Sequence, residues 1–330
     1  MGETFAGFAL RAELGRGAVA TVYLAEVGAR RFALKVLHEW LADDPEAIES
    51  FRDELRLSAF IRHPNVGQVV SAGDARRLPY LLGELVDGRA YSAVMRHAER
   101  SSSRLPVAFH LAVCARVAAG LHAAHEARDG RGASLGIVHR DVKPENVIVG
   151  FDGCVKLVDF GIARSSTSRQ TLDPASLNGT LAYLSPEQVL APWSVDKRAD
   201  IWALGVMLWE AVSRRRLFHR PSSAETLWNV VHLEPPPLLS VSADVPRDVS
   251  ELVARCMARE REERPPDLAT VENALRFAAI RGGFCSEQSI RAWMLICYSD
   301  AERRGGAPSE HSATQGPEML QLVELVQRMS

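Results

Sequence analysis

The eight residues from His139 to Asn146, with the sequence HRDVKPEN, constrain the fold and chemistry of this 330-residue chain more than any other stretch. They place a carboxylate, two cations and an amide within one short loop. Asp141 can orient an attacking hydroxyl and accept its proton. Lys143 can neutralise charge on a transferring phosphoryl group, and Asn146 can supply an oxygen ligand to magnesium. A loop of random composition is not expected to carry this order, so we interpret the stretch as a catalytic loop.

The tripeptide Asp-Phe-Gly at 159–161 begins thirteen residues after Asn146. The intervening residues 147–158 contain two short apolar, β-branched runs around a Phe-Asp-Gly turn, which predicts a β-hairpin. An aspartate at the end of an apolar strand suits a second magnesium ligand, since Mg²⁺ prefers hard oxygen donors. The tripeptide alone is a weak signal, but at this distance from the catalytic loop Asp159 becomes a strong candidate ligand.

Two glycines, Gly15 and Gly17, open a short segment that ends at Val22. Glycines at this spacing allow backbone N–H groups to approach phosphate oxygens without interference from a Cβ atom. A G-x-G turn between two strands is also common for purely structural reasons. The motif therefore indicates a phosphate-binding loop only in combination with the other motifs.

Lys35 lies in the middle of an apolar run, residues 32–37, that predicts a strand. A buried ammonium group needs a partner. Glu54 is the candidate, because it follows Phe51 by about one turn on a helix that Asp44 is expected to cap. Such an ion pair would hold Lys35 against the phosphates of a nucleotide. The alternative is an edge-strand lysine that reaches solvent.

The pattern of apolar residues changes along the chain. The first 90 residues alternate β-like runs with turns and contain one helix, which begins after Asp44. From about residue 106 the pattern is helical, with helices predicted at 107–127, 195–212, 248–258 and 268–279. The sequence thus predicts a small β-rich lobe followed by a larger helical lobe, joined near residues 86–89.

Beyond residue 281 the periodicity weakens. Residues 290–297 predict a short amphipathic helix, and residues 303–317 are rich in Gly, Ser, Pro and Ala, which is typical of a flexible linker. Apolar residues then recur at helical spacing over 319–326. We interpret residues 281–330 as a C-terminal extension.

Composition narrows the classes of partner. The formal net charge of −2 argues against nucleic acid as the main partner. The longest strongly apolar stretch, residues 201–212, contains Glu210 and is too short to span a bilayer, and the N-terminus has no secretory signal pattern. The five cysteines form no C-x-x-C pair, which favours free thiols in a reducing compartment. These features predict a cytoplasmic protein without a membrane span.

In their order, these motifs resemble those of the eukaryotic-like Ser/Thr protein kinases of bacteria, over residues 8–280. The resemblance implies an α+β, two-lobed protein kinase fold, with an N-lobe at 8–86 and a C-lobe at 87–280. It also implies ATP as the phosphoryl donor, Mg²⁺ as the cofactor, and serine or threonine hydroxyls of proteins as the acceptors. The active site would lie in the cleft between the lobes.

The resemblance also implies roles for individual residues. Asp141 would be the catalytic base, assisted by Lys143, and Lys35 would pair with Glu54. The metal ligands would be Asn146 and Asp159. The residues around the nucleotide would be Gly15, Gly17, Val22, Lys35, Glu84, Val86, Asn146 and Asp159. Within that set, Glu84 and Val86 would belong to the hinge that holds adenine by backbone groups.

Further residues fit the same pattern. Ser185-Pro-Glu187 stands where the family has Ala-Pro-Glu, so the resemblance implies an ion pair between Glu187 and Arg264. Asp200 would brace the backbone of the catalytic loop. Lys143, together with Thr180, looks like the Ser/Thr pattern rather than the tyrosine pattern.

Regulation is implied in the same way. Arg140 would bind phosphate on the activation loop, where the candidate hydroxyls are Thr167, Thr171 and Ser176. Self-association would allow autophosphorylation in trans.

The chain departs from the family pattern at several positions. Ala20 replaces a loop glycine, Gly83 occupies the position before the hinge where a larger side chain is usual, and Arg261 replaces a common proline. Residues 128–136 form an extra polar stretch. None of these changes removes a catalytic group, but two rival functions remain: a catalytically weak or dead kinase-fold scaffold, and a small-molecule kinase on a related fold. The segment at 160–187, which resembles a peptide-docking segment, argues against the second.

Overall fold

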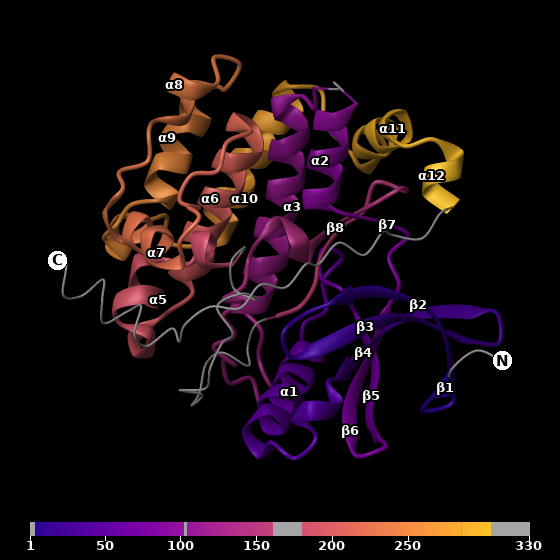
Figure 1. Ribbon diagram of the computed structural model, residues 1–330. Coiled ribbons are helices and arrows are strands. Elements are labelled where there is room, and N and C mark those ends of the chain that lie inside the picture. Colours follow the sequence, from indigo (N-terminus) through magenta and orange to yellow (C-terminus); the bar gives the residue numbers. More distant parts are fainter. Residues whose placement is uncertain (1–3, 102–103, 161–179, 285, 305–330) are drawn as a thin grey trace.

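A computed structural model describes residues 4–101, 104–160, 180–284 and 286–304 of the chain. It has a small β-rich lobe, in the lower part of Figure 1, and a larger helical lobe above it. The predicted two-lobed α+β fold is therefore confirmed.

The N-terminal lobe is built on a six-stranded antiparallel sheet with the strand order β1-β2-β3-β4-β6-β5. Its strands are β1 (Thr4–Phe5), β2 (Phe8–Arg16), β3 (Ala20–Val27), β4 (Arg30–Leu37), β5 (Val69–Ala75) and β6 (Leu78–Glu84). Apolar side chains that alternate along the strands cover both faces, since Leu34 and Leu82 join one cluster and Leu37 joins another. The second cluster packs against helix α1.

Helix α1 (Pro45–Ser58) begins where the sequence predicted it. The Asp44 side chain accepts hydrogen bonds from the backbone N–H groups of Glu46 and Ala47, and Pro45 occupies the first turn. Phe51 and Leu55 are buried against the sheet. This packing places the α1 face that carries Glu54 toward β4.

A second, three-stranded sheet belongs to the C-terminal lobe. Its strands are β7 (Gly88–Ala90), β8 (Val147–Gly150) and β9 (Val155–Leu157), in the order β7-β8-β9. Strands β8 and β9 pair antiparallel around the turn at 151–153, as the hairpin prediction required. The hairpin connects the catalytic loop to Asp159.

The C-terminal lobe is organised around two helices, α3 (Val107–His125) and α6 (Arg198–Ser213), whose surfaces are apolar on nearly all sides and therefore buried. The helices around them are α2 (Tyr91–Arg100), α5 (Pro186–Leu190), α7 (Ser223–His232), α8 (Leu238–Val241), α9 (Arg247–Cys256) and α10 (Leu268–Arg281). Helix α6 starts three residues later than the predicted 195. In the described part of the chain, α3 alone is long and apolar enough to cross a membrane, and 72% of its apolar window is buried inside the lobe.

The extension beyond residue 281 packs on the hinge side of the helical lobe. It forms α11 (Glu287–Cys297) and α12 (Asp300–Arg304), which lie beside α2 and β7 (Figure 1). The predicted linker beyond Arg304 and the predicted helix at 319–326 lie outside the described residues.

Contacts from three elements hold this extension in place. Ile290 and Met294 on α11 are fully buried in the main core. The Tyr298 ring stacks on His97 of α2 at a centroid distance of 4.2 Å, and His97 Nε2 lies 2.7 Å from the Cys297 carbonyl oxygen. Gly153, in the turn between β8 and β9, approaches so closely that a Cβ there would collide with the Glu287 carbonyl oxygen.

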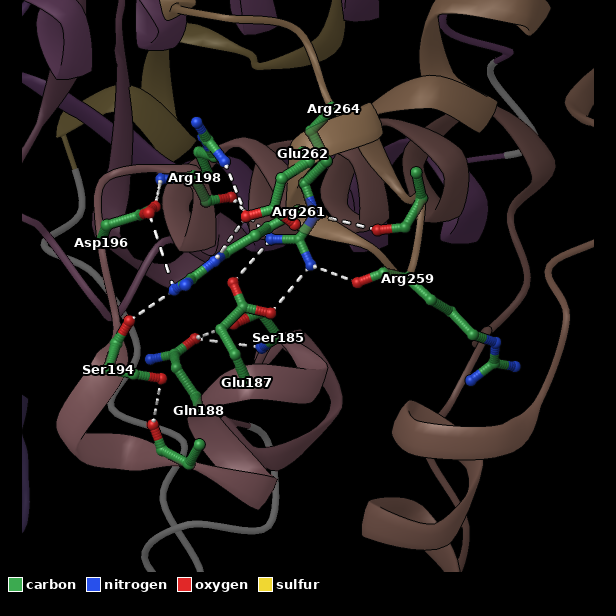
Figure 2. Close-up of polar contacts among 12 residues, drawn as sticks. Ser185, Glu187, Gln188, Ser194, Asp196, Arg198, Arg259, Arg261, Glu262 and Arg264 are labelled. Atoms are coloured by element: carbon green, nitrogen blue, oxygen red, sulfur yellow. Dashed lines mark hydrogen bonds and ion pairs between the residues drawn. The ribbon is translucent and has the colours of Figure 1, made fainter.

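A buried arginine anchors α5 to the base of the helical lobe (Figure 2). Arg264 donates to both carboxylate oxygens of Glu187, at 2.6 and 2.8 Å, and to three backbone carbonyl oxygens. Its side chain has no solvent exposure, and that of Glu187 is 12% exposed. The expected pair therefore forms, with the two-pronged geometry that makes Arg–carboxylate contacts strong.

Arg261, which stands where a proline is common, has contacts of its own in Figure 2. Its guanidinium donates to the Ser194 carbonyl oxygen at 2.6 Å and to Glu262 at 3.1 Å, and lies 3.7 Å from Asp196. These contacts are exposed, so we expect them to contribute little to stability.

Replacement of Glu187 by glutamine should lower the free energy of unfolding by about 3 kcal/mol, because it leaves the buried Arg264 guanidinium without a counter-charge. Glu262→Gln, which removes an exposed carboxylate from the same region, should change it by less than about 1 kcal/mol. Urea unfolding followed by circular dichroism measures both. Equal effects of the two variants would contradict this account.

Met294→Ala should destabilise the protein by about 2–5 kcal/mol, because it opens a cavity where α11 meets the core. Ile296→Ala is the control on the same helix, since the Ile296 side chain is 70% exposed and its loss should cost less than about 0.5 kcal/mol. Denaturant unfolding of the full chain distinguishes them. If Met294→Ala were as stable as the wild type, α11 would not be docked.

Candidate active site

Three residues of the catalytic loop, Asp141, Lys143 and Asn146, contact one another, and Lys143 also contacts Thr180. Asp141 accepts hydrogen bonds from Lys143 Nζ at 2.9 and 3.1 Å and from Asn146 Nδ2 at 3.0 Å. Lys143 also donates to the Thr180 hydroxyl at 2.8 Å. The Asp141 carboxylate is therefore oriented by a cation and an amide. The Thr180 hydroxyl, which lies 37 positions after Lys143 in the chain, in turn accepts a hydrogen bond from that cation.

The backbone of this loop is held by Asp200, as the resemblance implied. The Asp200 carboxylate accepts the N–H groups of His139 and Arg140, each at 2.8 Å. It also lies 2.7 Å from His125 Nε2, and both side chains are 1% exposed. Burial alone would raise the pKa of Asp200, but the contacts with His125 and His139 lower it below its ordinary value.

The sequence interpretation missed His125. This residue lies in the last turn of α3, 75 positions before Asp200, in a pattern that indicates only a core helix. A histidine among alanines carries no local signal of a buried polar partner. Its role follows from the crossing of α3 and α6.

Lys35 on β4 reaches two carboxylates. Its Nζ atom lies 2.6 Å from Glu54 Oε1 on α1 and 3.1 Å from Asp159 Oδ1. The Lys35 side chain is 17% exposed, so the alternative of a lysine reaching solvent is wrong. Burial alone would lower the pKa of Lys35, but the charges of Asp159 and Glu54 outweigh burial and raise it.

Asp159 is positioned from the catalytic-loop side. The Val158 N–H donates to the Asn146 carbonyl oxygen at 2.9 Å, and the Phe160 ring packs on His139 at a centroid distance of 4.5 Å. Asp159 itself has a φ of +57°, in the left-handed region. This turn directs its carboxylate toward Lys35 rather than along the strand.

The glycine-rich segment lies at the end of the sheet that faces these groups. Gly17 N–H donates to the Ala20 carbonyl oxygen at 2.9 Å, which closes a tight turn between β2 and β3. Val22 pairs directly across from Lys35 in the β3–β4 ladder. Ala20, which replaces a glycine of the family, is 5% exposed and packs with Leu37 and the α1 residues.

The residues assigned to the hinge lie at the end of β6. The Glu84 carboxylate accepts the Gln68 N–H at 2.8 Å and pairs with Lys156 Nζ at 2.8 Å. The Glu84 N–H also donates to the Gln68 carbonyl oxygen at 2.9 Å, so both the side chain and the amide of Glu84 contact neighbouring elements. The assignment of Glu84 and Val86 to an adenine-binding hinge stays a prediction. Val86 follows in the irregular connection to β7.

The sequence of the chain is similar to those of known protein kinases. The protein kinase domain model matches residues 8–276. The tyrosine-protein kinase MasK of Myxococcus xanthus is 33% identical over 83% of this chain and 43% of its own length. The serine/threonine-protein kinase PksC of Streptomyces coelicolor is 35% identical, over 84% of this chain and 50% of the relative.

The structure of the chain is also similar to solved structures of protein kinase domains. The crystal structure of the PknI kinase domain of Mycobacterium tuberculosis aligns with a TM-score of 0.62 and 28% identity, covering 84% of this chain and 98% of that one. The chain spans about half the length of the curated relatives it matches. With the family model matching most of its length, the chain belongs to the protein kinase family.

Proposed function

We propose that this chain is a Ser/Thr protein kinase that transfers the γ-phosphoryl group of ATP to hydroxyls of protein substrates. The observation that carries the proposal is the pairing of Lys35 with both Glu54 and Asp159, beside a catalytic loop in which Asp141 is oriented by Lys143. The family implies ATP as the substrate and typically Mg²⁺, and several bacterial relatives are named Ser/Thr kinases.

In the proposed reaction, Lys35 binds the α and β phosphates of ATP while Glu54 holds its ammonium group in place. Asp141 accepts the proton of the attacking hydroxyl, and Lys143 stabilises charge on the phosphoryl group in flight. The protein mainly positions the reactants and stabilises charge.

The donor set fits a magnesium ion held together with the nucleotide. Asp159 offers a carboxylate, and the Asn146 amide nitrogen is used by Asp141, which leaves the amide oxygen as a donor for a cation. Mg²⁺ in such sites is held by one or two protein ligands plus substrate phosphates. When bound, it would supply neutralising charge to the phosphate oxygens.

Acceptor specificity is proposed from the contact between Lys143 and Thr180, which looks like the Ser/Thr pattern. One relative is named a tyrosine-protein kinase, so the acceptor is an explicit readout of the test below. The rival function is a kinase-fold scaffold without activity. The assembled Lys35–Glu54–Asp159 contacts favour the enzyme.

We also propose that the catalytic unit is residues 8–280, with 281–330 as an extension, and that activity responds to phosphate on the activation segment. The hydroxyls concerned, Thr167, Thr171 and Ser176, lie outside the described residues. Self-association would allow this phosphate to be added in trans. We propose the cytoplasm as the location of the reaction, because ATP is available there.

Asp159→Ala and Asp141→Asn should each reduce phosphate transfer by about 10²–10⁴-fold, the range that covers the loss of one strong electrostatic element or of a general base. Asp43→Asn is the control, because the Asp43 side chain is 83% exposed and pairs with the exposed Arg77 rather than with any residue of the candidate site. The measurement is incubation with labelled ATP, with and without magnesium, followed by phosphoamino-acid analysis and phosphosite mapping.

Near-normal turnover of Asp159→Ala would refute the assigned site. No transfer by the wild type would favour the scaffold. Label on tyrosine alone would refute the proposed acceptor class.

The absence of a side chain at Gly83 leads to a second prediction about the nucleotide site. It lies between Ala33 and Val69 in the sheet, and a Cβ added there would meet only ordinary contacts, at 3.5 Å from the Gln68 carbonyl oxygen and from Leu81 Cδ2. The absent side chain should let ATP analogues with a bulky group on the adenine amine act as donors. Gly83→Met should block these analogues and spare ATP in competition assays.

Gly83→Ala is the matched control and should have a smaller effect than methionine, because it adds only the Cβ atom. Rejection of every bulky analogue by a wild type that uses ATP well would show that Leu81 or another side chain fills the space.

A further inference from the structure

A cavity of about 280 Å³ lies in the helical lobe next to the catalytic loop. Its walls come from α2, the start of α3, the turn at Pro144–Asn146 and the end of α6. Sites for small-molecule ligands usually have about 300–1,000 Å³. The volume therefore suits one or two amino-acid side chains better than a cofactor.

Arginines dominate the lining of this cavity. Arg96 comes from α2, and Arg214, Arg215 and Arg216 follow one another at the end of α6. Among the described residues, no carboxylate lies within 4.0 Å of the guanidinium groups of Arg96, Arg214 or Arg215. Three exposed cations thus face one cavity without an ion-pair partner in the described part of the chain.

The carboxylate deepest in the cavity is already occupied. Glu210 accepts hydrogen bonds from the Tyr183 hydroxyl at 2.8 Å, the Leu217 N–H at 2.9 Å and Arg216 at 3.0 Å. Its side chain is only 5% exposed. A basic side chain entering the cavity would have to displace Arg216, because the acceptor positions of Glu210 are used.

The remaining titratable groups leave an excess of positive charge. Glu99 and Glu145 also line the cavity and oppose the charge of the three unpaired arginines. His110 adds no charge, since burial and the neighbouring Arg214 lower its pKa to about 3. Three cations against two anions favour an anionic guest, which can make charge-assisted hydrogen bonds to guanidinium groups.

The cavity is within reach of a bound peptide. Glu145 in its wall is four residues from Asp141, so their Cα atoms are at most about 14 Å apart. An extended peptide rises about 3.3 Å per residue. A side chain two to four positions from a hydroxyl at Asp141 can therefore span the distance to the part of the cavity wall that Glu145 forms.

We propose that this arginine-lined cavity binds an anionic side chain of the protein substrate, a carboxylate or a phosphate group, two to four residues from the acceptor hydroxyl. The proposal rests on the proposed kinase function and names the substrate class of that site: acidic or previously phosphorylated segments.

The test uses the full chain and a set of Ser/Thr peptides that carry Asp, phosphoserine, Ala or Lys at each position around the acceptor. The variant is Arg96→Gln with Arg215→Gln. The matched control is Arg247→Gln with Arg255→Gln, two exposed arginines of α9 that line no part of the cavity. Phosphate transfer and, separately, peptide binding by fluorescence anisotropy are measured for all three proteins.

The wild type and the control should prefer Asp over Ala at one of these positions by about three- to tenfold, with phosphoserine at least as good, and the cavity variant should lose this preference. Added salt should weaken it, since the arginines are exposed. A preference for phosphoserine but not Asp would identify phosphate as the guest, and the reverse would identify a carboxylate.

Arg215→Glu provides a second readout, because it should shift the preference at the same position from Asp toward Lys. An acidic preference that persists in the cavity variant, no acidic preference in the wild type, or a preference for Lys would overturn the proposal. Arginine-dependent binding of acidic peptides without any phosphate transfer would sink the proposed function and leave only the binding of anionic side chains by the cavity standing. Transfer that ignores these arginines would do the opposite.

Discussion

The buried carboxylate of Asp200 is the group on which the geometry of the candidate active site depends. It lies in the first turn of α6, where the helix dipole favours a negative charge, and it accepts the amides of His139 and Arg140. Arg140 has a φ of +64°, a conformation that costs a residue with a side chain on the order of 1 kcal/mol or more. The hydrogen bonds from the His139 and Arg140 amides to Asp200 hold Arg140 in this conformation. The carboxylate in turn needs these donors, because it has no access to water.

A series of contacts connects the loop that Asp200 holds to the N-terminal lobe. The catalytic loop ends at Asn146, whose carbonyl oxygen receives the Val158 N–H and so sets the position of Asp159. Asp159 and Glu54 then share Lys35, which is a residue of the N-terminal sheet. A rotation of α1 or a shift of the sheet would separate charges that are partly withdrawn from solvent. The reactive geometry is therefore coupled to the relative position of the lobes.

The departures of this chain from the family pattern are absorbed locally. Ala20 fills a buried position between the sheet and α1, and Arg261 replaces a rigid residue with ionic contacts to the segment after α5. The extension after residue 281 adds a layer behind β7 and the β8–β9 turn, where Arg89 lies over the Phe151 and Tyr298 rings at 5.1 and 5.9 Å. None of these features removes the contacts of Lys35 with Glu54 and Asp159 or those of Asp141 with Lys143.

The sequence by itself determined the fold class, the order of the two lobes and the identity of the charged residues that meet in the candidate site. These follow from patterns that are local in the chain: the HRDVKPEN loop, the Asp-Phe-Gly tripeptide after a hairpin, and the cap at Asp44. Only the tertiary structure decided that His125 supports Asp200, that the Glu84 carboxylate pairs with Lys156, and that four arginines share one cavity. Those contacts join residues far apart in sequence, and helix crossings and sheet register, which no local pattern encodes, bring them together.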